Sequence, residues 1–498
     1  MWPSAMAVGV MGRAEQAEQA DSPLVEPGAE FQRSRFLARP SGYGLYQEVE
    51  TNEDLASANR QPTRHARKET DVTSLRIALM THGTRGDVQP LVALGREFLS
   101  RGHSPVLAVP AGFVEFVRNA GLPAEPLPAD WRGFLTDPTA DRSWLTSDDS
   151  TELLAGLRTV MAAHAGGIAQ TLIRLSEGAD LIVSGSLTED MATVIAEARE
   201  IPPALLHLFP VRRNGMLANP FVTGRSSAVR EQNVATHEAY ERASWESRRE
   251  GINALRAALG LAETELPTPD RVRAIGGIEL QAYSPHLVRG MDWPAHRPVV
   301  GWLDLDEHTR RAVGEYGLDP ELEAWLADGP APGYFGFGSM PVADAQAMVR
   351  TIEKATGELG LRAVVTAGWA ELSQSAVSDP NRIRVVGDTH HGALLRRCRF
   401  AVHHGGAGTT GAVARAGLPS LITSVMLDQA MWGEIVQRRG AGLHLPMRAV
   451  DAGSLGTALE GILTPEIMET AEVVGHAVRS EPDAVAAAAD SVLALAHD

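Results

Sequence analysis

From residue 75 onward, apolar residues fall into short continuous runs separated by longer amphipathic stretches. A short apolar run bounded by turn residues is typical of a buried strand, and apolar positions three or four apart are typical of a helix. The strands predicted in this way are 76–80, 105–109, 180–183, 204–208, 334–338, 362–366, 399–402 and 420–423. Helices are expected between them, for example at 88–101 and 345–359. Alternating strands and helices predict parallel sheets covered on both faces.

Changes in residue character indicate how the chain is divided. Residues 1–74 are polar and lack sustained periodicity, so we expect a disordered N-terminal extension there. The stretch from about 263 to 332 is rich in Pro, Gly and charge, which suits a linker, placed at 301–332. The remaining predictions are an N-terminal domain at 75–300, a C-terminal domain at 333–480 and a C-terminal helix at 481–498.

Length and charge restrict the class of protein. With 498 residues, the chain exceeds what one hydrophobic core usually serves. A formal net charge of −17 argues against nucleic acid as a partner, since binding phosphates normally needs a basic surface. No apolar run is long enough to span a bilayer, so we expect at most peripheral membrane contact. Cys398 is the only cysteine, which excludes an intrachain disulfide and favours a cytoplasmic protein. The sequence does not indicate the oligomeric state.

A glycine-rich loop directly after the strand 399–402 is the first candidate site. It reads His403-His404-Gly405-Gly406-Ala407-Gly408-Thr409-Thr410 and leads straight into a helix. Glycines let the backbone approach a phosphate, and the free N–H groups and dipole of a helix start favour negative charge. The loop therefore suits a diphosphate. The alternative is a tight turn selected only for packing, although the hydroxyls and imidazoles in the loop are more than such a turn requires.

The second candidate loop follows the first strand and includes His82, Gly83 and Asp87. Asp87 is expected at the start of a helix, where a capping carboxylate is the ordinary explanation. A carboxylate that faces a cleft can also accept the proton of an attacking hydroxyl, and partial burial raises its proton affinity. His82 is a rival base with a more suitable intrinsic pKa.

Other patterns are weaker indications of chemistry. Asp304 and Asp306 resemble a short acidic pair that holds a divalent metal on a diphosphate, but they lie in the Pro-rich stretch and we interpret them as linker. His390 and His391 lack the spacing of metal ligands. There is no phosphate-binding P-loop, and no GxGxxG follows the first strand. We therefore expect no metal and no cofactor.

Together the two loops resemble the GT1 family of GT-B glycosyltransferases, in the branch of sterol glucosyltransferases and of macrolide and glycopeptide antibiotic transferases. The resemblance runs from about Leu75 to the C-terminus. Its most specific segments are 83–90, 336–340, 403–410 and Asp428-Gln429 followed by Trp432-Gly433. The linker segment 301–306 also resembles the domain connector of this branch. The resemblance implies an α/β GT-B fold, with two Rossmann-like doubly wound parallel-sheet domains facing across a cleft.

The resemblance also implies roles for individual residues. Asp87 takes the position of the catalytic base, and Asp428 and Gln429 those that hydrogen-bond sugar hydroxyls. Val386, Gly387 and His391 belong to the segment that receives the nucleotide base, which here lacks a stacking Trp. The residues implied to hold the diphosphate are His403, Gly405, Gly406, Gly408, Thr409 and Thr410, with Ser339 reaching it from the opposite loop.

The resulting expectation is an inverting, metal-independent transferase. It moves a hexose, preferably glucose, from a UDP- or dTDP-sugar to a hydroxyl of an apolar small molecule such as a sterol or a polyketide macrolide. The acceptor pocket is expected in the N-terminal domain, including the region 127–172. Its plausible lining residues, which are equally plausible as core, are Trp131, Phe134, Trp144, Leu145, Met161, Phe209 and Phe221. Two alternatives remain: a nucleotide-sugar-binding protein without turnover, and a GT-B-fold nucleotide-sugar epimerase.

Overall fold

The computed structural model describes residues 74–128, 156, 159–160, 162–223, 225–338, 344–368, 374–387, 389–425 and 428–496. All of them fall within the unit Gly44–Asp498. The expected disordered extension lies outside the described residues except for Ser74.

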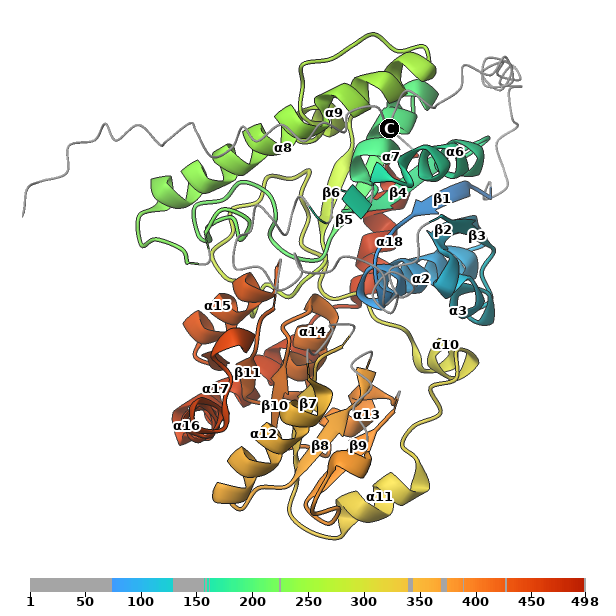
Figure 1. Ribbon diagram of the computed structural model, residues 1–498. Helices are drawn as coiled ribbons and strands as arrows, with labels where there is room; N and C mark the ends of the chain where they lie inside the picture. Colours follow the sequence, from blue (N-terminus) through green and yellow to red (C-terminus); the bar gives the residue numbers. More distant parts are fainter. Residues whose placement is uncertain are drawn as a thin grey trace, which may run out of the picture. The chain divides into compact units, whose positions relative to one another are not determined.

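The first of two parallel sheets among the described residues is built from the N-terminal half of the chain (Figure 1). Its strands lie in the order β3-β2-β1-β4-β5-β6. Ile77 of β1 is paired with Pro105 of β2 on one side and with Leu181 of β4 on the other. The order of the strands reverses between β1 and β4, and in open α/β sheets ligands bind beyond the carboxyl ends of the strands at such a switch point. The strands are β1 (Arg76–Met80), β2 (Ser104–Pro110), β3 (Ala124–Leu127), β4 (Leu181–Gly185), β5 (Pro203–His207) and β6 (Ile278–Gln281).

Alternate residues of β1 enter two separate hydrophobic cores. Ile77 and Leu79 pack on one face against α2 and the C-terminal helix α18 (Ala484–Ala494), whereas Ala78 and Met80 pack on the other against α6, α7 and α8. Both faces are apolar because a parallel sheet is covered on both sides, which explains the continuous apolar run. The helices of this half are α2 (Arg85–Ser100), α3 (Val114–Asn119), α6 (Ala165–Leu175), α7 (Glu189–Arg199), α8 (Arg230–Ala258) and α9 (Thr268–Ala274), with a 3₁₀ turn η1 (Ala111–Phe113).

The second sheet repeats this arrangement. Its order is β12-β11-β10-β7-β8-β9, so that its first and fourth strands along the chain, β7 and β10, are again neighbours at the switch point. Gly333 of β7 is packed closely against Phe400 of β10, since a Cβ at Gly333 would lie 2.1 Å from that ring. The strands are β7 (Gly333–Gly336), β8 (Ala363–Thr366), β9 (Ile383–Val386), β10 (Phe400–His403), β11 (Ser420–Ile422) and β12 (Gly442–His444).

Helices cover both faces of the second sheet as well. Phe335 and Val402 pack in one core with α12 and α16, and Tyr334 and Ala401 pack in another with α11, α13 and α14. The elements are α10 (Glu307–Ala312), α11 (Pro320–Ala327), α12 (Ala345–Glu358), η4 (Gln374–Ala376), α13 (His391–Leu395), α14 (Ala407–Ala416), α15 (Gln429–Arg439), η5 (Met447–Ala449), α16 (Ala452–Ile462) and α17 (Pro465–Arg479).

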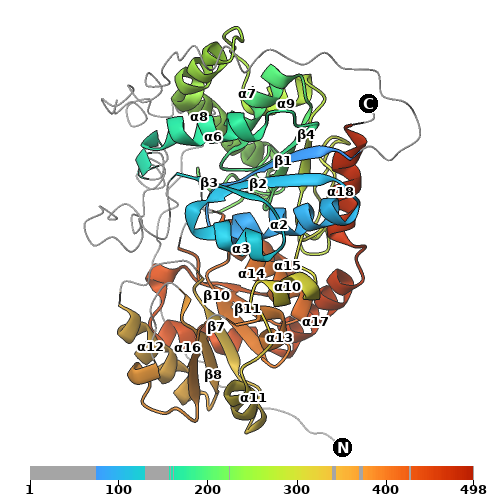
Figure 2. The same ribbon diagram turned by 90° about the vertical axis from the view of Figure 1, so that its right-hand side faces the viewer.

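The last helix, α18 (Ala484–Ala494), returns to the first half of the protein. Ala488, Ala489 and Val492 are fully buried in the core that α2 forms with the first sheet. Arg101, just after α2, donates a hydrogen bond of 2.5 Å to Asp490. Figure 2 shows this red helix beside the blue elements of the first sheet.

The two parallel sheets with flanking helices confirm the predicted α/β fold. Every predicted strand overlaps an observed one, but the pattern missed β3, β6, β9 and β12. In β3, Glu125 and Pro126 interrupt the apolar run, and in β6 the inward residues Glu279 and Gln281 are polar. β12 has only three residues.

Candidate active site

Asp87 is the third residue of α2 and completes the capping box of that helix with the N-cap residue Thr84, and the pKa of its carboxyl is strongly shifted. Its Oδ2 accepts hydrogen bonds from the N–H of Thr84 at 2.8 Å and from the Thr84 hydroxyl at 3.2 Å, which forms part of a capping box. Burial nevertheless raises the pKa of Asp87 to about 6, against the lowering effect of the Thr84 bonds. The capping interpretation is therefore correct, and the same carboxyl has a proton affinity suited to a base near neutral pH.

The turn before Asp87 depends on Gly83. Gly83 has a φ of +117°, and a Cβ there would lie 2.4 Å from Asp87 Oδ2. A side chain at this position would therefore strain the backbone and displace the carboxylate. His82, the rival base, is only 1% exposed, and its Nε2 lies 3.4 Å from the carbonyl oxygen of Pro128. Asp87 is therefore the partly exposed candidate of the two, and His82 the buried one.

The start of α14 is open toward solvent. The helix begins at Ala407, has no acidic residue in its first turn, and has no side-chain cap hydrogen bond. The first N–H groups of any helix lack acceptors within the helix. Gly408 is exposed, and no atom of the described residues lies within 4 Å of where its Cβ would be. This turn therefore has room and polarity for an anion.

The glycines before α14 bring the loop close to the rest of the domain. Gly405 has a φ of +91°, and a Cβ there would lie 2.7 Å from Ile422. Gly406 leaves room for the His404 ring, because a Cβ at Gly406 would lie 2.5 Å from His404 Nε2. The hydroxyl of Thr410 donates to the Gly406 carbonyl at 2.9 Å, so among the two threonines Thr409 is the one placed toward solvent.

The two histidines of this loop have different surroundings. His403 is completely buried; its Nδ1 accepts the N–H of Gly405 at 3.2 Å, and its Nε2 lies 2.7 Å from the Ser420 hydroxyl. Burial, together with the neighbouring His404 and His391, lowers the pKa of His403 to about 3. The ring is neutral, and both of its nitrogens hold the loop. His403 thus lies behind the loop rather than at its open side.

His404 lies between the loop that follows β7 and the loop that precedes α14. A Cβ at Gly338 would lie 2.6 Å from His404 Cε1, so the ring is close to Gly338 as well as to Gly406. The ring is 9% exposed, and its Nδ1 has no hydrogen-bond partner within the described part of the chain. Burial lowers the pKa of His404 to about 4, so the ring is neutral. The sequence motif contained His404, but only the fold shows that its ring, unlike that of His403, lies against Gly338 of the loop after β7.

Asp428 and Gln429 stand at the start of α15. Burial, then the charge of Asp87, raise the pKa of Asp428 to about 7. The charge of Asp87, the predicted base, therefore acts on Asp428, the predicted sugar ligand, although 340 residues lie between them in the chain. Gln429 is buried, and its Oε1 accepts the N–H of Val425 at 2.8 Å, which fixes the loop before α15.

The remaining donor-site candidates lie at the end of β9 and after β7. Val386 ends β9, and its carbonyl accepts the N–H of Ala367 at 2.8 Å; no atom of the described residues lies within 4 Å of where a Cβ at Gly387 would be. His391 begins α13, and its Nε2 lies 2.9 Å from the hydroxyl of Tyr334. Ser339 lies outside the described residues.

The acidic pair of the linker is engaged in structural interactions. Asp304 accepts a hydrogen bond of 3.0 Å from Gln89 and forms ion pairs with Arg310 and Arg415. Asp306 is the N-cap of α10, accepting from Thr309 N–H and hydroxyl at 2.8 Å each. Within the described residues, no group of three or more His, Cys, Asp or Glu is placed to hold a metal ion.

The predicted acceptor region is described only in part. Trp131, Phe134, Trp144, Leu145 and Met161 lie outside the described residues. Phe209 packs beside the core that contains Trp302 and Trp432, and Phe221 stacks on Tyr240 at 5.0 Å between ring centroids. None of the helices that the structure describes is long and apolar enough to cross a membrane.

Comparison with protein families identifies both halves of the chain. Residues 77–216 match the glycosyltransferase family 28 N-terminal domain, and residues 354–492 match the erythromycin biosynthesis protein CIII-like C-terminal domain. The two matched segments contain the Asp87 turn and the α14 turn respectively.

Whole-length relatives carry the same assignment. A protein of Mycobacterium tuberculosis named as an uncharacterized glycosyltransferase is 32% identical over 422 residues, covering 84% of this chain and 98% of that protein. A sterol 3-beta-glucosyltransferase of Arabidopsis thaliana is 29% identical over 427 residues, covering 84% of this chain and 65% of that protein.

Solved structures share the fold. The calicheamicin glycosyltransferase CalG4 has a TM-score of 0.61 at 17% identity, covering 85% of this chain and 98% of that one. The glycosyltransferase VinC in complex with dTDP has a TM-score of 0.59 at 20% identity, covering 85% of this chain and all of that one. The two sheets, the two matched domains and the whole-length relatives agree: the chain belongs to the GT-B glycosyltransferases and is a glycosyltransferase.

Proposed function

We propose that this glycosyltransferase moves a hexose, preferably glucose, from a UDP- or dTDP-sugar to a hydroxyl of an apolar small molecule, with inversion and without a metal. The observation that carries the proposal is that the buried carboxyl of Asp87, whose own pKa is raised, lies close enough for its charge to raise the pKa of Asp428. A protein that only bound a nucleotide sugar would need the α14 turn and Asp428, but not a second perturbed carboxyl from the other half of the chain.

The donor diphosphate is assigned to the open turn of α14. The N–H groups of the first turn of α14 present a partial positive charge to the diphosphate. The hydroxyl of Thr409 adds a hydrogen-bond donor. His404 adds a neutral imidazole from the side, while His403, Gly405, Gly406 and Thr410 hold the shape of the loop. Val386, Gly387 and His391 are assigned to the nucleotide base, and Ser339 to the diphosphate.

The transfer is a single displacement. The acceptor oxygen attacks the anomeric carbon and gives its proton to the carboxylate of Asp87. The bond from the anomeric carbon to the diphosphate oxygen breaks, and its electron pair leaves with the diphosphate. The α14 turn stabilises the charge that develops there, which is the task a metal ion has in other transferases. Asp428 holds hydroxyls of the hexose close to Asp87.

The names of two similar proteins support the choice of substrates. The Arabidopsis relative is named for glucose and for the 3-beta hydroxyl of a sterol, and VinC was solved with dTDP.

The test is a transfer assay with UDP-glucose and dTDP-glucose, each offered with a sterol, a macrolide aglycone and a flat phenol. The expected product is heavier by one hexose, and the coupling constant of its anomeric proton reports a β-linkage from the α-linked donor. An α-linked product would contradict the single displacement. Tight donor binding without transfer would favour a binding protein, and a C2-inverted sugar formed without acceptor would favour an epimerase.

A further inference from the structure

The turn that joins β4 to α7 is fixed at both ends. The N–H of Thr188 donates to the carbonyl of Gly185 at 3.2 Å and closes the turn. The hydroxyl of Thr188 donates to the carbonyl of Met80, the last residue of β1, at 3.0 Å, and lies 2.8 Å from the Ser184 hydroxyl. Because these bonds reach two neighbouring strands, they hold Leu187 in one position at the switch point of the first sheet.

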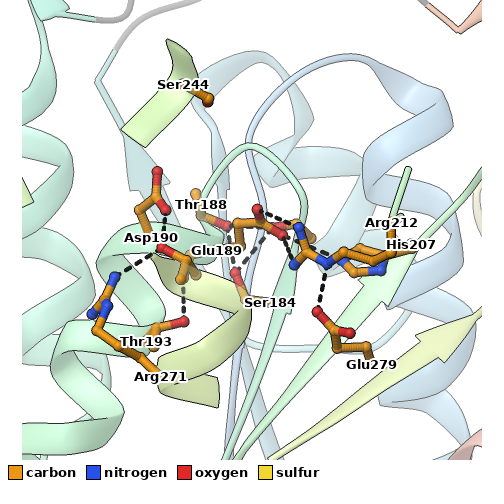
Figure 3. A network of polar contacts seen from close by, with 12 residues as sticks. Ser184, Thr188, Glu189, Asp190, Thr193, His207, Arg212, Ser244, Arg271 and Glu279 are labelled. Carbon is orange, nitrogen blue, oxygen red and sulfur yellow. Dashed lines mark hydrogen bonds and ion pairs between the residues drawn. The ribbon is translucent and has the colours of Figure 1, made fainter. Parts of the chain in front are cut away.

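A buried ionic network secures the other side of this turn (Figure 3). Glu189, the first residue of α7, receives hydrogen bonds from Arg212 at 2.9 and 3.3 Å and lies 3.2 Å from His207 Nε2. Arg212 also donates to Glu279 at 2.5 Å. Burial alone would raise the pKa of Glu189, but the Arg212 guanidinium brings it below its ordinary value, so the pair stays charged. The charged groups of this network pair with one another, and we interpret them as positioning residues for the turn between β4 and α7.

Leu187 lies next to the carboxylate of Asp87. The position that a Cβ would take at Gly83 is 3.2 Å from Leu187 Cδ1 and 2.4 Å from Asp87 Oδ2, so both groups border the same point above the turn. Leu187 is 41% exposed, and Asp87 is partly buried beside it. An apolar side chain and a proton acceptor thus stand side by side at the edge where ligands bind in such sheets.

The exposure of a single leucine does not by itself indicate a binding site, since single apolar residues are common on protein surfaces. Leu99 is comparably exposed, at 39%, but lies near the end of α2, away from the carboxyl ends of the strands. What distinguishes Leu187 is its rigid turn and its contact with the Gly83–Asp87 turn.

We propose that Leu187 is a specificity residue of the acceptor site, selecting hydroxyls that are flanked directly by hydrocarbon over the hydroxyls of polyols. The inference rests on the proposed function, in which Asp87 receives the acceptor proton. A hydroxyl that reaches Asp87 brings its neighbouring carbons onto the Leu187 side chain. Hydrocarbon there gains contact and loses water, whereas a neighbouring hydroxyl would lose its hydration without a partner.

Binding and transfer are measured for the wild type, for Leu187→Asn and for the matched control Leu99→Asn. The probes are 4-methylumbelliferone, followed by its own fluorescence, cholesterol in detergent micelles, and methyl glucoside as the polyol. Affinity for dTDP and the thermal midpoint verify that each variant is folded. We expect Leu187→Asn to weaken binding of both apolar alcohols by about tenfold. Leu99→Asn should leave binding unchanged, and methyl glucoside should bind neither variant nor the wild type.

The outcomes separate this inference from the proposed function. Unchanged affinity of the apolar alcohols in Leu187→Asn, preference for methyl glucoside, or no binding of any apolar alcohol would overturn the role of Leu187. If binding follows the expected pattern but no hexose is transferred, the proposed function fails and the role of Leu187 stands. If transfer occurs with the same acceptor KM in Leu187→Asn and wild type, only the role of Leu187 fails.

Discussion

The turn before α2 and the turn before α14 have the same construction but opposite electrostatic character. Each follows a strand at the switch point of its sheet and leads into a helix, with glycine as the second helical residue, Gly86 in α2 and Gly408 in α14. The third helical residue differs. It is Asp87 in the first turn and Thr409 in the second.

This one difference decides which charge each turn accepts. The helix start of α2 is occupied by its own carboxylate, that of Asp87, which accepts the Thr84 N–H and is partly exposed. The helix start of α14 has no carboxylate, so its N–H groups remain available to an anion from outside. In the proposed function, the first of these turns supplies the base and the second binds the diphosphate.

Removing the charge of the first turn should have the largest effect. Asp87→Asn keeps the shape and can still accept the Thr84 N–H, but it cannot take a proton. We expect kcat to fall by about two orders of magnitude or more, with the donor KM little changed. Steady-state kinetics with the nucleotide sugar check this, and near-normal turnover would transfer the role of base to another group, with His82 the first to examine.

The pH dependence gives a control for the same substitution. Because the pKa of Asp87 is raised to about 6, the carboxylate form is lost below that pH, and wild-type kcat/KM should fall about tenfold per pH unit there. This decrease of kcat/KM at low pH should be absent in Asp87→Asn.

The raised pKa of Asp87 also predicts a change in stability. The folded state loses stability as pH rises from about 4 through 6, because the buried carboxyl must then lose its proton. At pH 7.5 the free energy of unfolding of Asp87→Asn should therefore exceed that of the wild type by about 1–2 kcal/mol, with a higher thermal midpoint. A lower midpoint would show that the cap matters more than the buried charge.

Thr409→Asp makes the second turn into a copy of the first. A carboxylate at this position competes for the same N–H groups and repels the diphosphate, so affinity for UDP and dTDP should fall by about a hundredfold. Calorimetric titration measures it, with Thr409→Ser as the control that keeps the hydroxyl and adds no charge. The helix itself should not be destabilised, since an acidic residue in the first turn is favourable. Unchanged nucleotide affinity would contradict the assignment of the diphosphate to this turn.

Replacement by Phe should affect stability differently at the adjacent His404 and His403. His404→Phe removes a buried nitrogen that has no partner within the described residues, so the thermal midpoint should hold or rise while dTDP affinity falls by about tenfold. His403→Phe leaves the Ser420 hydroxyl and the Gly405 N–H unpaired and should cost about 2–3 kcal/mol of stability. Equal losses of stability in both variants would contradict the separate roles.

The sequence predicted the fold well because its strands are buried on both faces. A continuous run such as 76–80 needs no tertiary information to be recognised. β6 was missed because its buried residues Glu279 and Gln281 are polar, and they are satisfied by Arg212, Arg297 and Tyr283 from elsewhere in the chain. Such a strand is visible only when its partners are known.

The sequence predicted which loops form the candidate site, but not which way the side chains of those loops point. His403 is the last paired residue of β10, opposite Gly336 of β7. Successive residues of a strand point to opposite faces, so the strand pairing decides whether His403 or its neighbour points into the core. The closeness of Asp428 to Asp87 and of Leu187 to Gly83 depends on packing between distant segments, which no local pattern records.

The placement of α18 against α2 has a consequence for synthesis and for engineering. The helix that carries Asp87 completes its core with residues made some 400 positions later, so the first half cannot finish folding as it leaves the ribosome. A chimera that exchanges the acceptor half must therefore bring Ala484–Ala494 with it, because a foreign helix there would meet α2 with the wrong surface.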